Sequence, residues 1–152
     1  MAIRNPLART ALTATAAALA LGAWPGPAAA LDDAALIQLG ESEYMSQCAS
    51  CHGPAGQGDG PVAAVLTKKP ADLTQITARY SGSFPTDAME QMIDGRNMIN
   101  PHGDRGMPVW GDRYFQTATE QAQTVPHDVD AQALTHGRIS ALVRYLESIQ
   151  AD

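Results

Sequence analysis

The sequence is poor in aromatic residues and in cysteine. Aromatic residues make up 5% of its 152 residues, and Cys48 and Cys51 are its two cysteines. A structural zinc site needs about four ligands, so one cysteine pair without a histidine pair at finger spacing argues against a zinc finger. No β-α-β pattern surrounds the pair, which argues against a thioredoxin-like redox motif.

Positive charge is also scarce, particularly after residue 30. Residues 31–152 hold all 16 acidic residues but only 8 of the 10 basic ones, which gives this part a formal net charge of −8. Such a chain is a poor partner for nucleic acid, whose phosphates attract basic proteins. The acidic balance instead favours a partner with a basic docking surface.

The one long apolar run lies near the N-terminus. Two arginines precede an Ala/Leu-rich segment at residues 11–23, and Ala28-Ala29-Ala30 supplies small residues for cleavage. This order is typical of a bacterial Sec-type signal peptide, so we expect residues 1–30 to be cleaved and residues 31–152 to form one domain in the periplasm. The run is shorter than the ~20 residues that cross a bilayer, so no stable membrane span is expected after cleavage.

The most specific motif is Cys48-Ala49-Ser50-Cys51-His52. This C-x-x-C-H spacing is the attachment signature of c-type haem. Two thiols within one helical turn can each form a thioether to a vinyl group of the porphyrin, while His52 offers an imidazole nitrogen to the iron. The motif predicts one covalently attached haem c, bound through Cys48 and Cys51 and ligated by His52. A structural disulfide is the alternative use of the same two cysteines.

Apolar spacing predicts a helical chain around this motif. The expected helices cover residues 33–47, 62–66, 86–96, 112–122 and 136–150. Asp32 or Asp33 is the expected N-cap of the first helix, and Thr86 or Asp87 that of the third. Met89 and Met92 lie on one face of the third helix, where we expect them to pack in the core.

Gly40 lies in the middle of the first expected helix, four residues before Tyr44. Glycine costs helix stability relative to alanine, so a close approach by another helix is a natural reason for it. The last expected helix has an apolar face, and we expect it to cross the first helix at Gly40 and Tyr44.

Residues 53–61 follow the motif and contain six glycines or prolines among nine residues, which predicts a loop. No strand precedes this loop and no G-K-[ST] follows, which argues against a phosphate cradle. A carbonyl near Pro61, or near Pro70 in a second loop, can accept the free ring N–H of His52 and fix its tautomer. We predict that the acceptor is at Pro70.

The sixth iron ligand is less directly indicated. A thioether or an imidazole can take this position, and the candidates are Met98, His102, Met107, His127 and His136. Met107 precedes Pro108, whose ring biases it toward extended backbone. A stiff loop of this kind presents a flexible side chain at a fixed place, so Met107 is the predicted ligand. We expect Trp110 either to donate its indole N–H to a haem propionate or to pack against the porphyrin.

Taken together, these features resemble the class I cytochromes c, in their bacterial, monohaem, His/Met-ligated form. The resemblance rests on the signal peptide, Gly40-x-x-x-Tyr44 running into C-A-S-C-H, the Pro70 and Met107-Pro108 loops, and the C-terminal L-V-R-Y-L. It implies an all-α fold, with a few helices wrapped around one haem and crossing N- and C-terminal helices. It also implies axial ligation by His52 and Met107, and single-electron transfer as the function.

The resulting hypothesis is a periplasmic electron carrier with redox-protein partners and no enzymatic activity of its own. One alternative is an electron-transfer subunit of a periplasmic dehydrogenase or oxidase complex. The other is a haem enzyme or gas-binding protein with an open sixth position, in which His102 or Arg105 is the distal group. The segment 112–135 is long for this family, and we expect either a surface elaboration or a partner surface there.

Overall fold

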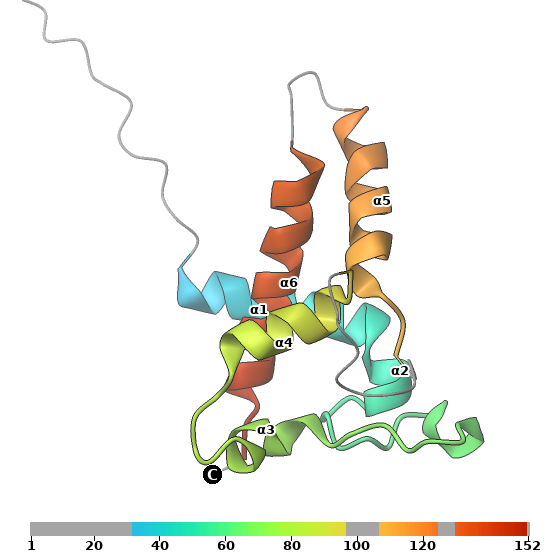
Figure 1. The fold of residues 1–152 in the computed structure, drawn as a ribbon, viewed down its shortest axis with the longest axis vertical. Helices are drawn as coiled ribbons and strands as arrows, with labels where there is room; N and C mark the ends of the chain where they lie inside the picture. Colours follow the sequence, from blue (N-terminus) through green and yellow to red (C-terminus); the bar gives the residue numbers. More distant parts are fainter. Residues whose placement is uncertain (1–31, 97–106, 125–129, 152) are drawn as a thin grey trace, which may run out of the picture. The chain divides into compact units, whose positions relative to one another are not determined.

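The computed structural model describes residues 32–96, 107–124 and 130–151, and these ranges contain helices and no strand (Figure 1). The elements are α1 (Asp33–Gln47), α2 (Ala49–His52), η1 (Ala63–Val65), η2 (Leu73–Gln75), α3 (Ile76–Arg79), α4 (Thr86–Asp94), α5 (Trp110–Ala122) and α6 (Ala131–Ser148). The predicted all-α fold is confirmed. Residues 31–152 form one compact unit, while cleavage after residue 30 stays a prediction. None of the helices in the described ranges is long and apolar enough to cross a membrane.

The predicted helix start is confirmed for α1, whereas α6 starts earlier than predicted. Asp32 caps α1 by accepting a hydrogen bond from the Ala35 backbone N–H at 2.7 Å, as predicted. Helix α6 starts at Ala131, before the expected residue 136, because Asp130 accepts from the Gln132 backbone N–H. The expected cap of α4 is wrong, since its N-cap position is Pro85 and no side chain caps it.

Helices α1 and α6 cross at Gly40, as predicted (Figure 1). A Cβ atom on Gly40 would lie 2.0 Å from the Ala141 carbonyl oxygen and 2.8 Å from the Tyr145 Cβ. Only a glycine lets the two backbones approach this closely. One turn later the rings of Tyr44 and Tyr145 lie 5.2 Å apart, and the buried Tyr44 hydroxyl donates to the Gly53 carbonyl.

The core lies between α1, α4, α5 and α6. Met89 and Ile93 of α4 are buried and Met92 packs against the core, which confirms the core role predicted for the two methionines. Helix α5 packs along α6 (Figure 1), and its Trp110 and Tyr114 are buried. The expected helix at 112–122 is therefore confirmed, with a start at Trp110. Because it contributes to the core, the expectation of a mere surface elaboration at 112–135 is wrong for this helix.

Arg96 links the end of α4 to α5 and α6. Its guanidinium donates to both carboxylate oxygens of Asp94, at 2.7 and 2.8 Å, and to Gln132 on α6 at 2.9 Å. The same group lies 5.8 Å from the ring centre of Phe115 on α5. A Cβ on Gly111 would lie 2.2 Å from the Asp94 Oδ1. We call Asp94, Arg96, Gly111, Phe115 and Gln132 the Arg96 cluster.

Replacing Asp94 by asparagine should lower the free energy of unfolding by about 1 kcal/mol at neutral pH, the range of a partly exposed charge-assisted hydrogen bond. The hydrogen bonds from Arg96 hold the pKa of Asp94 below its ordinary value of 3.8. Because the folded-state pKa is the lower one, this stabilisation is present above the ordinary pKa and is lost as the pH falls through the lowered pKa. Denaturant unfolding of the wild type and of Asp94→Asn, near neutral pH and near the lowered pKa of Asp94, measures this stabilisation. A stability difference that is the same at both pH values contradicts the prediction.

Candidate haem site

The two cysteines and His52 lie on one continuous helical stretch. Cys48 ends α1 by donating its backbone N–H to Tyr44, and α2 begins at the next residue. The backbone N–H of His52 donates to the Cys48 carbonyl at 2.9 Å. Both cysteines are half-buried and free, so the disulfide alternative is not formed in this structure. Two free thiols and an imidazole within one turn are the arrangement that haem attachment requires.

The Cys48 thiol lies in an apolar and acidic environment. Burial, together with the nearby Glu43 carboxylate and Cys51, raises the pKa of this thiol to about 12. Cys48 also packs against the hydrophobic core. A thioether has no ionisable proton, so this environment suits the attached form of the cysteine.

The glycine-rich loop after the motif folds back onto α2. Backbone N–H groups of Gly58, Gly60 and Val62 donate to the carbonyls of His52, Cys51 and Ser50, at 2.7, 3.1 and 3.0 Å. These bonds satisfy carbonyls that a helix end otherwise leaves unpaired. A Cβ on Gly60 would lie 2.4 Å from the Ser50 carbonyl oxygen, so glycine is needed there for the close approach.

The imidazole of His52 is oriented by the second loop. Its Nδ1 lies 2.9 Å from the Ala71 carbonyl oxygen. Since a carbonyl can only accept, Nδ1 donates and Nε2 is left with its lone pair for a metal. The prediction that Pro70 supplies the acceptor is therefore corrected by one residue. The Pro70 carbonyl instead packs against Gly58, where a Cβ would lie 2.4 Å away, and the next carbonyl along the chain reaches the imidazole.

Met107 is far from the motif in the sequence, but it packs against the same hydrophobic core. Its half-buried side chain packs on the hydrophobic cluster that Cys48 also contacts. Of the alternative ligands, Met98, His102 and His127 lie outside the described residues. His136 is on α6 with 70% of its side chain exposed, close to Glu90, and does not reach the core.

Trp110 is the first residue of α5 and is buried. The ring of Tyr114 lies 6.1 Å from its own, and the Arg113 guanidinium lies 5.0 Å from its centre. Its place in the core is consistent with packing against a porphyrin. The propionate bond stays a prediction.

A buried hydroxyl next to Cys48 was not singled out from the sequence. Tyr114 is 4% exposed, and its hydroxyl lies near the Glu43 side chain but makes no well-formed hydrogen bond in the part of the chain that the structure describes. Burial raises the pKa of Tyr114, and the nearby Glu43 carboxylate acts in the same direction. The orphaned hydroxyl, the free thiols, the oriented imidazole and the half-buried thioether together fit a bound haem.

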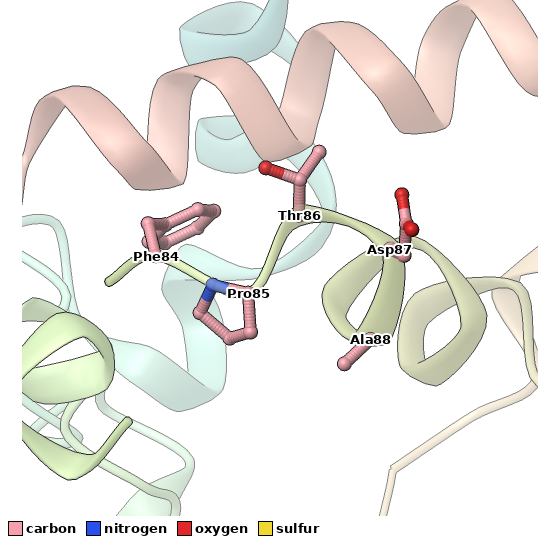
Figure 2. A pocket seen from close by; sticks show the side chains of 5 residues that line it. All are labelled: Phe84, Pro85, Thr86, Asp87 and Ala88. Atoms are coloured by element: carbon pink, nitrogen blue, oxygen red, sulfur yellow. The ribbon is translucent and has the colours of Figure 1, made fainter. Parts of the chain in front are cut away.

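A shallow groove is present at the start of α4. It is lined by Phe84, Pro85, Thr86, Asp87 and Ala88 (Figure 2). Phe84 and Ala88 pack against the hydrophobic core, but the groove contains neither cysteine, nor His52, nor Met107. We therefore assign the candidate site to the motif and Met107 rather than to this groove.

The all-α fold and the C-x-x-C-H helix define a c-type cytochrome. Residues 35–146 match the family described as cytochrome c oxidase, cbb3-type, subunit III, and the chain belongs to this family. It is a haem-carrying electron-transfer protein with covalently bound haem c, and its partners are redox proteins. Domains of this kind are typically extracytoplasmic. The curated proteins and the solved structures gave no match.

Proposed function

We propose that this chain is a periplasmic carrier of single electrons, exported by residues 1–30, with His52 and Met107 as axial ligands. One observation carries the proposal: Met107, far from the motif in sequence, packs against the same core as Cys48. The bond from His52 Nδ1 to Ala71 supports the assignment of Nε2 as the first ligand. Closure of both axial positions by the protein favours a carrier over an enzyme, because it leaves no position for oxygen or peroxide.

Each residue of the site has a distinct part in this function. When bound, the haem supplies the one-electron chemistry of its iron. Cys48 and Cys51 tether the cofactor, so it is not lost during repeated exchange with partners. The Ala71 carbonyl fixes the tautomer of His52 and increases its basicity as a ligand. As a ligand, the Met107 thioether would exclude exogenous ligands and would raise the reduction potential relative to bis-imidazole ligation.

The charge of the protein supports a partner with a basic docking surface. Three arginines in the described ranges are paired with carboxylates: Arg96 with Asp94, Arg138 with Glu43, and Arg144 with Asp33. Each of these pairs is close to neutral, so the unpaired acidic residues, which outnumber the remaining basic ones, dominate the field at long range.

The description of the family favours a second candidate function, an electron-transfer subunit of a periplasmic oxidase or dehydrogenase complex. A free carrier that docks by surface charge separates from its partner as salt screens the attraction. A subunit with a stable interface stays bound. Purification from the native membrane fraction at high salt therefore separates the two candidates.

Replacing Met107 by alanine tests the ligand assignment. We expect the reduction potential to fall by on the order of 0.1 V, within the ~0.8 V range that axial ligands impose. We also expect the reduced protein to bind carbon monoxide rapidly. Met45 on α1 is 49% exposed and gives a matched control, because Met45→Ala should change neither property. An unchanged redox titration of Met107→Ala contradicts the assignment.

A further inference from the structure

We propose that the Arg96 cluster positions Met107, by holding together the two backbone segments that precede and follow residues 97–108. The inference rests on the proposed role of Met107 as the sixth ligand. It assigns a task to residues that lie outside the haem-attachment motif and that touch neither thiol nor imidazole.

The two segments are in direct contact. The C-cap of helix α4 is Gly95, which has a φ of 68° and so adopts a left-handed conformation that suits glycine. A Cβ on Gly95 would lie 3.4 Å from the Val109 Cγ1. A Cβ on Gly111 would lie 2.6 Å from the Asp94 carbonyl oxygen and 2.6 Å from the Arg96 Nε. Residues 94–96 and 109–111 therefore lie in direct contact, and the contact is tightest at Gly111, where Asp94 and Arg96 leave no space for a Cβ.

The planar guanidinium of Arg96 forms part of this contact, since its Nε lies against Gly111 and its centre lies 5.8 Å from the ring centre of Phe115 on α5. The bidentate bond to Asp94 sets the orientation of the guanidinium, and a third bond reaches Gln132 on α6. Both side chains of the ion pair are only about a quarter exposed, at 21% for Arg96 and 26% for Asp94. The pairing raises the pKa of Arg96 and lowers that of Asp94, so both groups stay charged at neutral pH. Lysine cannot reproduce the two parallel bonds, because its ammonium is a point charge.

The position of Met107 follows from that of Val109. One residue, Pro108, separates them, and its ring both fixes its own φ and biases Met107 toward extended backbone. The backbone at Met107 therefore has little freedom once Val109 is packed on Gly95. Loosening the Arg96 cluster lets Val109 shift, and the population in which the Met107 sulfur is away from the iron increases. Arg96 acts through the backbone, so it is a positioning residue and not a ligand.

The experiment compares Arg96→Lys with Arg144→Lys in the haem-loaded protein. Arg144 pairs with Asp33 and Glu147, away from the Arg96 cluster, so its variant controls for the loss of an arginine ion pair. The readouts are the sulfur-to-iron absorption band of the oxidised protein, carbon monoxide binding to the reduced protein, and thermal unfolding. We expect Arg96→Lys to weaken the band and to speed carbon monoxide binding about tenfold, the effect of losing one charge-assisted hydrogen bond. Arg144→Lys should leave both unchanged.

Gly111→Ala is a second variant, because its methyl group would push directly on Asp94. It should have the same effect as Arg96→Lys on the band and on ligand binding. If Met107→Ala admits carbon monoxide while Arg96→Lys and Gly111→Ala exclude it as the wild type does, this inference fails and the proposed function stands. If the wild-type protein itself lacks the band and binds carbon monoxide at once, both fail.

Discussion

Replacing Cys48 and Cys51 together with alanine should abolish covalent attachment of the haem. The protein would then lose its haem stain completely after denaturing electrophoresis, because no thioether remains to hold the cofactor when the fold is lost. The axial bond from His52 alone does not survive denaturation. This is the largest functional effect that we expect from any substitution in the chain.

A neighbouring serine provides the control for this experiment. Ser50 lies between the two cysteines and is exposed. Ser50→Ala leaves both thiols in place, so it should retain the stain. A double cysteine variant that still stains after denaturation would show that the haem is attached elsewhere.

Replacing Gly40 by alanine should have the largest effect on stability. The new methyl group would lie 2.0 Å from the Ala141 carbonyl oxygen, and only movement of a whole helix backbone can relieve this overlap. We expect a loss of about 3 kcal/mol, the upper end of the cost of overpacking, although alanine is the better helix former by about 1 kcal/mol. This corresponds to a decrease of about 10 °C in the midpoint of thermal unfolding.

Gly137 is the matched control, because it lies inside α6 and a Cβ there meets nothing within 4 Å. Gly137→Ala should therefore gain stability, by up to about 1 kcal/mol, from helix propensity alone. If the two alanine variants unfold at the same temperature, the close crossing of α1 and α6 at Gly40 is wrong.

The crossing of α1 and α6 could be predicted because its signals are local. A glycine inside a predicted helix and an apolar face on a second helix are both visible along the chain, and the structure confirms both. Helix α6 starts earlier than the apolar pattern predicts, because Asp130 caps it ahead of a first turn that is only weakly apolar. The predicted cap of α4 is wrong for a different reason. Thr86 and Asp87 are good capping residues, but Pro85 occupies the N-cap position.

Some residues of the candidate site could likewise be predicted from a local sequence motif, while others are brought together only by the fold. Haem attachment needs both thiols and the imidazole within one turn, so its residues are adjacent in sequence and form a specific motif. The acceptor of His52 is a backbone carbonyl, which any residue has, and so residue types cannot separate Ala71 from Pro70. Tyr114 near Glu43 and the Arg96 cluster bring together residues from different helices. Such groupings depend on how the helices pack, and no pattern along one helix indicates them.

Family membership makes the chain a haem-carrying electron-transfer protein, and the sixth ligand decides how it works. With Met107 on the iron, the protein can only pass electrons to and from partners. Without it, the iron has a free position at which small molecules can bind or react. The difference between a carrier and a haem enzyme thus depends on one thioether bond, and it can be observed directly.

The absorption spectrum of the purified mature protein, oxidised and then reduced, before and after addition of carbon monoxide, tests this claim most directly. We predict a weak long-wavelength sulfur-to-iron band in the oxidised protein and no change of the reduced spectrum with carbon monoxide. Absence of that band together with immediate binding of carbon monoxide would contradict ligation by Met107 and indicate an enzyme or gas-binding protein.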